Sequence, residues 1–189
     1  MYIAQAKRKE NIAEYILYVW QLEDLLRALQ FSPEAIYSAL VKPAAIGDPA
    51  TENNLLLWYM DVGNLLREEG KEKSGHLDHT MHLITDLHNL HLELMRSPAG
   101  VRYRELYERL TPELPALREV MGKEDISDTE LMFRSLYAVM LYRIKGDGTK
   151  ESSISGVIEL VSPVIGELAR IFHIAERGEL DIWNEKTPL

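Results

Sequence analysis

The sequence contains no cysteine among its 189 residues. This absence excludes disulfides, catalytic thiols and thiolate metal ligands, so any metal would have to be bound by histidine and carboxylate side chains. No apolar run approaches the roughly 18 residues that a membrane-spanning helix needs, and the N-terminus lacks the uninterrupted apolar segment of a signal peptide. We therefore expect a cytoplasmic protein that does not span a membrane.

Positive charge is also scarce, because 21 Lys and Arg residues stand against 30 Asp and Glu residues, which gives a formal net charge of -9. Such a balance repels phosphate backbones and anionic lipids, whereas nucleic-acid-binding proteins usually carry a basic stripe. We expect neither nucleic acid nor membrane as a partner. The length and the hydrophobic content of 46% are typical of one globular domain, which we predict to span residues 1–189.

Strand patterns are missing as well, since no segment alternates apolar and polar residues between hairpin turns. Apolar residues instead recur at spacings of three and four, as in amphipathic helices. Capping residues, often Ser or Thr before Pro, mark helix starts, and glycines mark helix ends. The sequence predicts helices at about 11–30, 33–41, 52–69, 72–96, 99–110, 112–121, 128–145 and 153–177.

These segments predict an all-α, single-domain helical bundle with about five long core helices and two or three short ones. The core helices are those at 11–30, 52–69, 72–96, 128–145 and 153–177. The two longest loops are expected around KPAAIGDP and over GDGTKESS at 146–153. Pro163 lies within the last predicted helix and predicts a kink or a short break there.

Histidine is concentrated in one place, because five of the six histidines fall on the predicted helix 72–96. His79, His82 and Asp86 share a polar stripe of this helix, at spacings where two neighbours can reach one metal ion but all three cannot. A closed site would need a further ligand from another helix. We therefore interpret these three residues as a solvent-exposed polar face and a weak metal site that is not constitutively occupied.

Two other histidines, His88 and His91, fall within the apolar arc of the same helix, where burial requires hydrogen-bond partners. Glu23 lies on the inward face of the first long helix, and a buried carboxylate is rarely left unpaired. We expect Glu23 to be buried and paired with His88, His91 or Arg27. Two interpretations remain open: a buried polar network that fixes helix register, or a ligand or metal pocket formed by these residues.

Known catalytic motifs are missing from the chain. It has no Glu-x-x-His pair of di-iron bundles, no His-Glu-x-x-His and no Gly-x-Ser-x-Gly. The aromatic residues, Tyr15, Trp20 and Trp58 among them, have core-like spacing and predict core packing more than a cofactor site. We name no catalytic residue, expect no cofactor and favour a protein that is not an enzyme.

The apolar arc of helix 72–96 covers more than half of its circumference, which is wider than one core requires. Either this helix is central in the bundle, or a second copy of the chain covers part of it in a homodimer. The leading functional hypothesis is therefore a non-catalytic cytoplasmic interaction or assembly protein. The alternative is a metal- or small-ligand-binding helical protein, possibly an enzyme, with a pocket around Glu23, His88 and His91.

Two segments, KENIAEYILYVWQLEDLLRA and GHLDHTMHLITDLHNLHLELM, resemble a family of all-helical Bacteroidales proteins defined as domain of unknown function 4924. The resemblance covers nearly the whole chain. It implies a compact all-helical domain of similar length, and it brings no activity, cofactor or catalytic residue with it.

Overall fold

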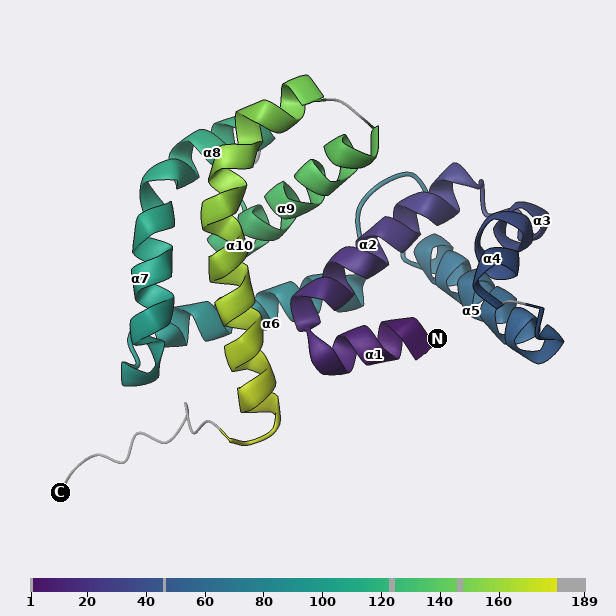
Figure 1. The fold of residues 1–189 in the computed structure, drawn as a ribbon, viewed down its shortest axis with the longest axis horizontal. Helices are drawn as coiled ribbons and strands as arrows, with labels where there is room; N and C mark the ends of the chain where they lie inside the picture. Colours follow the sequence, from purple (N-terminus) through teal and green to yellow (C-terminus); the bar gives the residue numbers. More distant parts are fainter. Residues whose placement is uncertain (1, 46, 123–124, 146–147, 180–189) are drawn as a thin grey trace. The chain divides into compact units, whose positions relative to one another are not determined.

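The computed structural model describes residues 2–45, 47–122, 125–145 and 148–179, and every regular element in these ranges is a helix (Figure 1). The prediction of an all-α fold is confirmed. No helix in these ranges is both long enough and apolar enough to cross a membrane. The chain divides into two compact units: unit 1 comprises Met1–Glu10 and Glu14–His82, and unit 2 comprises Asn11–Ala13 and Leu83–Leu189. A single domain over residues 1–189 remains a prediction.

The first part of the chain forms a series of helices that mostly follow the predicted segments. They are α1 (Tyr2–Glu10), α2 (Ile12–Ala28), α3 (Pro33–Ile36), a π-helical turn (Tyr37–Val41), α4 (Lys42–Ala45), α5 (Pro49–Glu68) and α6 (Asp78–Leu94). Helix α1 was not predicted, because no capping signal precedes it. Its C-terminal turn, Lys7–Lys9, places positive charge at the negative end of the helix dipole.

The start of α2 was predicted at Asn11, and this is confirmed because the Asn11 side chain accepts a hydrogen bond from the Ala13 backbone N–H at 3.0 Å. Two other boundaries differ from the prediction. Helix α5 begins in the predicted loop at Pro49, where Asp48 caps it by accepting from the Ala50 N–H. Helix α6 begins at Asp78 instead of position 72, so the segment before it is not helical.

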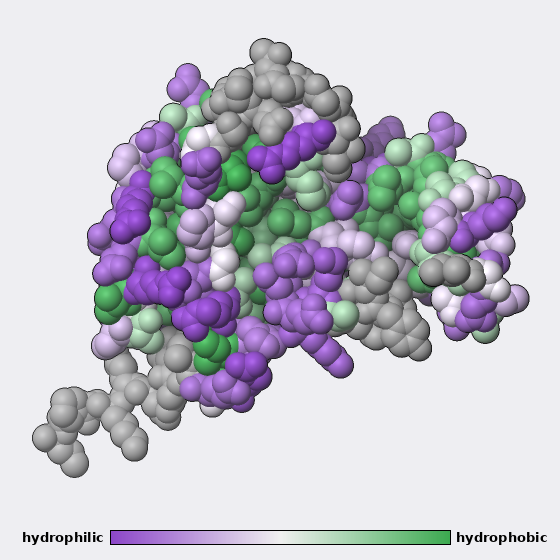
Figure 2. Space-filling model, viewed as in Figure 1, coloured by the Kyte–Doolittle hydropathy of each residue, from purple (hydrophilic) through white to green (hydrophobic). Residues whose placement is uncertain are grey.

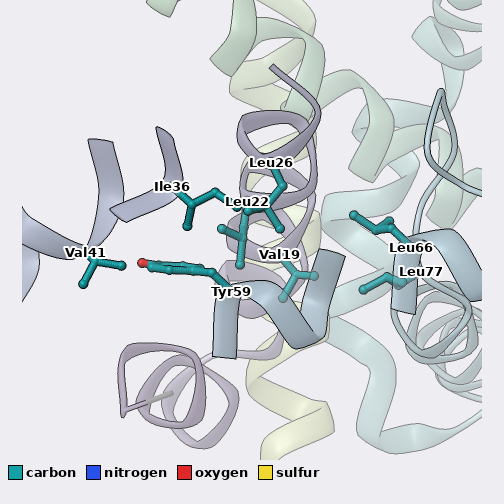
Figure 3. Close-up of a cluster of buried hydrophobic side chains, with 8 residues drawn as sticks. All are labelled: Val19, Leu22, Leu26, Ile36, Val41, Tyr59, Leu66 and Leu77. Carbon is teal, nitrogen blue, oxygen red and sulfur yellow. The ribbon is translucent and has the colours of Figure 1, made fainter. Parts of the chain in front are cut away.

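The core of unit 1 is an apolar cluster that joins α2 to the helices that follow it. Figure 3 shows the side chains of α2 with Ile36, Val41 and Tyr59 on one side and Leu66 and Leu77 on the other. The buried members of the cluster are Val19, Leu22, Leu26, Ile36, Val41, Tyr59, Leu66 and Leu77. This cluster fixes α2 and α5, the two helices that carry the candidate site.

The end of α2 is sharply turned at two residues that are not glycine. Gln30 and Phe31 have φ angles of 53° and 55°, in the left-handed region that side chains disfavour. Their backbone N–H groups satisfy the helix carbonyls of Arg27 and Leu26, at 2.9 and 3.0 Å. The turn therefore ends the helix at a cost in backbone energy.

The second part of the chain contains α7 (Val101–Leu110), α8 (Leu114–Met121), α9 (Asp128–Lys145) and α10 (Gly148–Glu176), with 3-10 turns at Pro98–Gly100 and Thr111–Glu113. Helices α7 to α9 agree with the predicted segments. Gly100 allows the close approach between α6 and α7, because a Cβ on it would lie 1.9 Å from the Leu94 carbonyl oxygen. Arg104 donates to the same oxygen at 2.7 Å.

Helix α10 differs from the prediction at two points. It begins at Gly148, so the expected loop at 146–153 is helical from that residue onward, while residues 146 and 147 lie outside the described residues. The helix also continues through Pro163, where a kink or a short break was predicted, so the helix is not broken there. Pro163 cannot donate to the Glu159 carbonyl, and both residues are exposed, so solvent can satisfy that oxygen and the proline is tolerated.

Replacing Gln30 by glycine is expected to raise the free energy of unfolding by about 0.5–1 kcal/mol, because glycine adopts the left-handed conformation without the Cβ penalty. Chemical denaturation measures the change. The matched control is Gln21→Gly in the interior of α2, where the same substitution should lower stability by about 1 kcal/mol. A loss of stability in both variants would contradict the prediction.

Candidate functional site

Glu23 lies on the inward face of α2 and is fully buried, with 0% of the residue exposed. Its carboxylate accepts a hydrogen bond from the Leu77 backbone N–H at 3.1 Å and lies 2.8 Å from Nδ1 of His76. The predicted burial and hydrogen bonding of Glu23 are therefore confirmed. The predicted partners were wrong, because the described hydrogen bonds of Glu23 involve neither Arg27 nor His88 nor His91.

The late start of α6 explains this difference. Since the helix begins at Asp78, the N–H of Leu77 is not engaged in a helical hydrogen bond and points to a side-chain acceptor instead. Had the helix begun at position 72, this donor would have been satisfied within the helix. The non-helical segment thus provides both partners of the carboxylate.

Trp20 lies one turn before Glu23 and holds the same segment. Its ring stacks on the His76 imidazole, with centroids 3.8 Å apart and planes 12° from parallel. Its indole N–H donates to the Thr80 hydroxyl at 3.1 Å, and that hydroxyl donates to the Leu77 carbonyl at 2.8 Å. Trp20, Glu23, His76, Leu77 and Thr80 are called the Glu23 network below.

Arg27 binds the backbone of the loop between α5 and α6, which leads to His76 and Leu77. Its guanidinium donates to the carbonyl oxygen of Lys71 at 3.0 and 3.2 Å, to that of Gly75 at 2.6 Å and to the Asp24 carboxylate at 2.8 Å. Every buried side-chain nitrogen or oxygen in the described residues has a hydrogen-bond partner. This arrangement favours the polar-network interpretation of Glu23, and the ligand pocket built on Glu23, Arg27, His88 and His91 remains a prediction.

A pocket of about 270 Å³ lies between α2 and α5 in unit 1, and we call it the α2–α5 pocket. Most of its wall is apolar or aromatic. It is lined by Tyr15, Val19, Leu22, Trp58, Asp61, Val62, Leu65, Leu77 and His79. Leu77 connects the two features, because its backbone N–H is bound by Glu23 while the residue forms part of the pocket wall.

Two of the polar lining residues form a hydrogen bond with each other. The Tyr15 hydroxyl and Nε2 of His79 share a hydrogen bond of 3.1 Å. Although His79 is exposed, partial burial of its ring lowers its pKa, and the nearby carboxylates of Glu23 and Glu69 only partly oppose this effect. His79 is therefore neutral at neutral pH, and it presents a hydrogen-bonded ring instead of a charge to the pocket.

The predicted polar stripe is exposed as expected, since His79, His82 and Asp86 are all solvent-accessible. Within the described residues no group of three or more histidines and carboxylates is placed so that it could hold a metal ion. Weak metal binding by this stripe stays a prediction.

The other two histidines have partners of their own in unit 2. Nδ1 of His91 lies 2.7 Å from the Tyr103 hydroxyl, and the His91 ring is 4.7 Å from that of Tyr107. His88 is half-buried, with Nδ1 3.3 Å from the Thr129 hydroxyl and its ring 5.5 Å from that of His91. Burial was thus predicted correctly for His91 and in part for His88.

An ion pair lies next to Tyr107, whose ring contacts that of His91. Asp128 accepts from the Tyr107 hydroxyl and pairs with Arg118. The Ser127 hydroxyl caps α9 by accepting from the Glu130 N–H at 3.1 Å, so the Asp128 side chain binds these partners instead of capping the helix. Burial raises the pKa of Tyr107 well above its usual range, so the tyrosine remains a neutral donor.

Sequence reasoning missed the structural importance of His76, Trp20 and Thr80. Trp20 and Glu23 are three residues apart and therefore share one face of α2, which was a usable signal. No signal placed His76 outside the helix, because the apolar and histidine spacing continues smoothly from His76 into α6. The α2–α5 pocket was missed because Tyr15 and Trp58 were both assigned to core packing.

The family of this chain follows from comparison with known proteins. Residues 1–179 match the family described as Domain of unknown function, DUF4924. The chain belongs to this family. Comparison with curated proteins and with solved structures finds no match. The match confirms the resemblance to this family and names neither an organism nor an activity, so a function has to be argued from the geometry of the site.

Truncating Glu23 to alanine is expected to lower the free energy of unfolding by roughly 1–3 kcal/mol, because the Leu77 N–H and the His76 ring would lose a buried acceptor. Thermal and urea denaturation measure the loss. Glu14→Ala is the control, since Glu14 is an exposed partner of Lys7 and its loss should cost at most about 1 kcal/mol. Equal stability of the two variants would show that the Glu23 network does not hold the fold.

The pKa of His91 is lowered by burial and by the neighbouring His88, which Asp128 partly opposes. Below the ordinary histidine pKa of about 6.5, the unfolded chain therefore binds a proton that folded His91 resists, and stability falls as pH falls. One such proton contributes at most about 1.4 kcal/mol per pH unit. His91→Asn should make the decline between pH 7 and pH 5 shallower in urea titrations.

The control for this pH dependence is His82→Asn, which removes an exposed histidine from the same helix. It should leave the decline close to that of the unmodified chain. If His91→Asn and His82→Asn show the same dependence of unfolding free energy on pH, His91 is not the group that opposes protonation.

Proposed function

We propose that this chain is a non-catalytic interaction protein whose α2–α5 pocket receives an apolar side chain of another protein. The apolar lining of the pocket carries this proposal. Its volume of about 270 Å³ lies at the lower edge of the roughly 300–1,000 Å³ range of pockets that enclose a small molecule. A pocket of this size on an open apolar surface suits a single anchoring side chain of a protein partner.

The surroundings of the pocket support the same function. Leu25 on α2 and Leu57 and Leu65 on α5 are 41%, 55% and 37% exposed, and Leu65 also lines the pocket. Figure 2 shows apolar residues at the surface in the region where Figure 1 places α2 to α5. Such residues around an anchor pocket would be covered when a partner binds.

The chemistry of the lining argues against catalysis. Among the described residues that line the pocket there is no serine, threonine or lysine to act as a nucleophile. Tyr15 and His79 bond to each other, and Asp61 is the one carboxylate in the lining. The pocket thus offers apolar area with little reactive chemistry, which favours binding over turnover.

A cytoplasmic location and a homodimer belong to this proposal as finer expectations. The absence of cysteine is compatible with the location. The main sequence argument for a dimer has weakened, because Ile84, Leu87, Leu90 and Leu94 of the wide apolar arc are buried within the chain. A second copy therefore becomes one possible partner for the α2–α5 pocket among others.

The proposal can be tested by selecting binders from a library of helical peptides and measuring their affinity by calorimetry. Leu65→Glu places a charge at the pocket and should weaken the selected peptides at least about tenfold, as expected for an anchor contact. Leu92→Glu is the matched control, because Leu92 is 41% exposed and does not line the pocket. Peptides that bind both variants as tightly as the unmodified chain would contradict the proposal.

Light scattering distinguishes a second copy from a different protein. A species of twice 21.7 kDa that Leu65→Glu converts to the monomer would make the chain its own partner. A monomer that still selects peptides at the pocket would support a different protein as the partner.

A further inference from the structure

From the one carboxylate in the lining of the α2–α5 pocket we infer the chemistry of its partner: a basic amphipathic helix that places a lysine or arginine against Asp61. This inference rests on the proposed function of the pocket and adds the class of partner to it. The group that carries it is the Asp61 carboxylate, which belongs to the lining of an otherwise apolar wall.

The position of Asp61 within the wall matters first. Trp58 precedes Asp61 by three residues on α5, and Leu65 follows it by four, so the three side chains lie on one face of the helix. Val62 lies beside them and also lines the pocket. The carboxylate is therefore flanked by apolar contact surface one helical turn away in each direction.

Asp61 is distinguished from the other polar lining groups by its contacts. Tyr15 and His79 are bonded to each other, whereas no hydrogen bond or ion pair is described for the exposed Asp61 within the part of the chain that the structure covers. Water satisfies this carboxylate while the pocket is open. An apolar partner that covers the wall would remove that water and leave a desolvated charge, which is costly without compensation.

A cation on the partner removes this cost. A lysine or arginine opposite Asp61 would replace the lost water with an ion pair that is shielded by the surrounding apolar residues. The adjacent Trp58 ring could also contact the cation, since indole is the best aromatic partner for cations. The net charge of -9 favours the approach of such a partner over an acidic one.

The shape of the wall indicates a helix. The lining residues Tyr15, Val19 and Leu22 are spaced by four and three on α2, and Trp58, Asp61 and Leu65 are spaced by three and four on α5. An amphipathic helix can pack its apolar face along such rows while one of its apolar side chains enters the pocket. The partner should therefore carry apolar anchors at helical spacing, with its cation within one turn of an anchor.

The test selects peptides from one helical library separately against the unmodified chain, Asp61→Asn and Asp61→Lys. Peptides selected by the unmodified chain should share a lysine or arginine next to the apolar anchors and bind Asp61→Asn about fivefold or more weakly. Those selected by Asp61→Lys should carry aspartate or glutamate at that position. Glu68→Gln is the control, because Glu68 is an exposed carboxylate of α5 that does not line the pocket, and this variant should bind like the unmodified chain.

The possible failures are distinguishable. Peptides that depend on Leu65 but bind Asp61→Asn as tightly as the unmodified chain would overturn the inference about charge and leave the proposed function intact. A selection that yields only peptides insensitive to both Leu65→Glu and Asp61→Lys would overturn the proposed function together with the inference. Added salt gives an independent readout, since it should weaken binding to the unmodified chain more than binding to Asp61→Asn.

Discussion

The burial of one carboxylate determines how the first unit of this protein is built. Glu23 is inaccessible to solvent, and a carboxylate in that position is tolerated only if hydrogen-bond donors surround it. The chain supplies them from a segment more than 50 residues away, through the His76 ring and the Leu77 N–H. The segment must therefore stay non-helical at this point, and the start of α6 is delayed to Asp78 as a result.

The candidate site depends on the same contact. Leu77 is bound at its backbone by Glu23, and its side chain belongs both to the apolar core of unit 1 and to the wall of the α2–α5 pocket. Val19 and Leu22, which lie within one turn of Glu23 on α2, also share both roles. The pocket is thus lined partly by residues that the core already holds in place. Binding a partner would therefore cost little conformational entropy in these side chains.

Sequence patterns predicted the parts of the fold that depend on periodicity and local capping. The all-α class, the start of α2 at Asn11 and the burial of Glu23 follow from apolar spacing and from capping chemistry, which act over one or two helical turns. The partner of Glu23 depends instead on where α6 begins, and that boundary is determined by a contact between segments distant in sequence. The continuation of α10 through Pro163 likewise depends on which side of the helix faces solvent, which local propensity does not determine.

The histidines show why residue type alone did not locate the site. His76, His79 and His91 come from one short stretch of sequence, yet the first stacks on Trp20, the second bonds to Tyr15 and the third bonds to Tyr103. Each contacts a different aromatic residue. Within the described residues the histidines therefore do not come together as ligands of one metal ion. Histidine here serves mainly as a flat, polar partner for aromatic rings, whereas the carboxylate in the pocket lining belongs to Asp61. If the pocket binds a partner as proposed, an apolar wall with one carboxylate would discriminate between partners by the cost of covering the charge, which is a physical basis for specificity at a small surface.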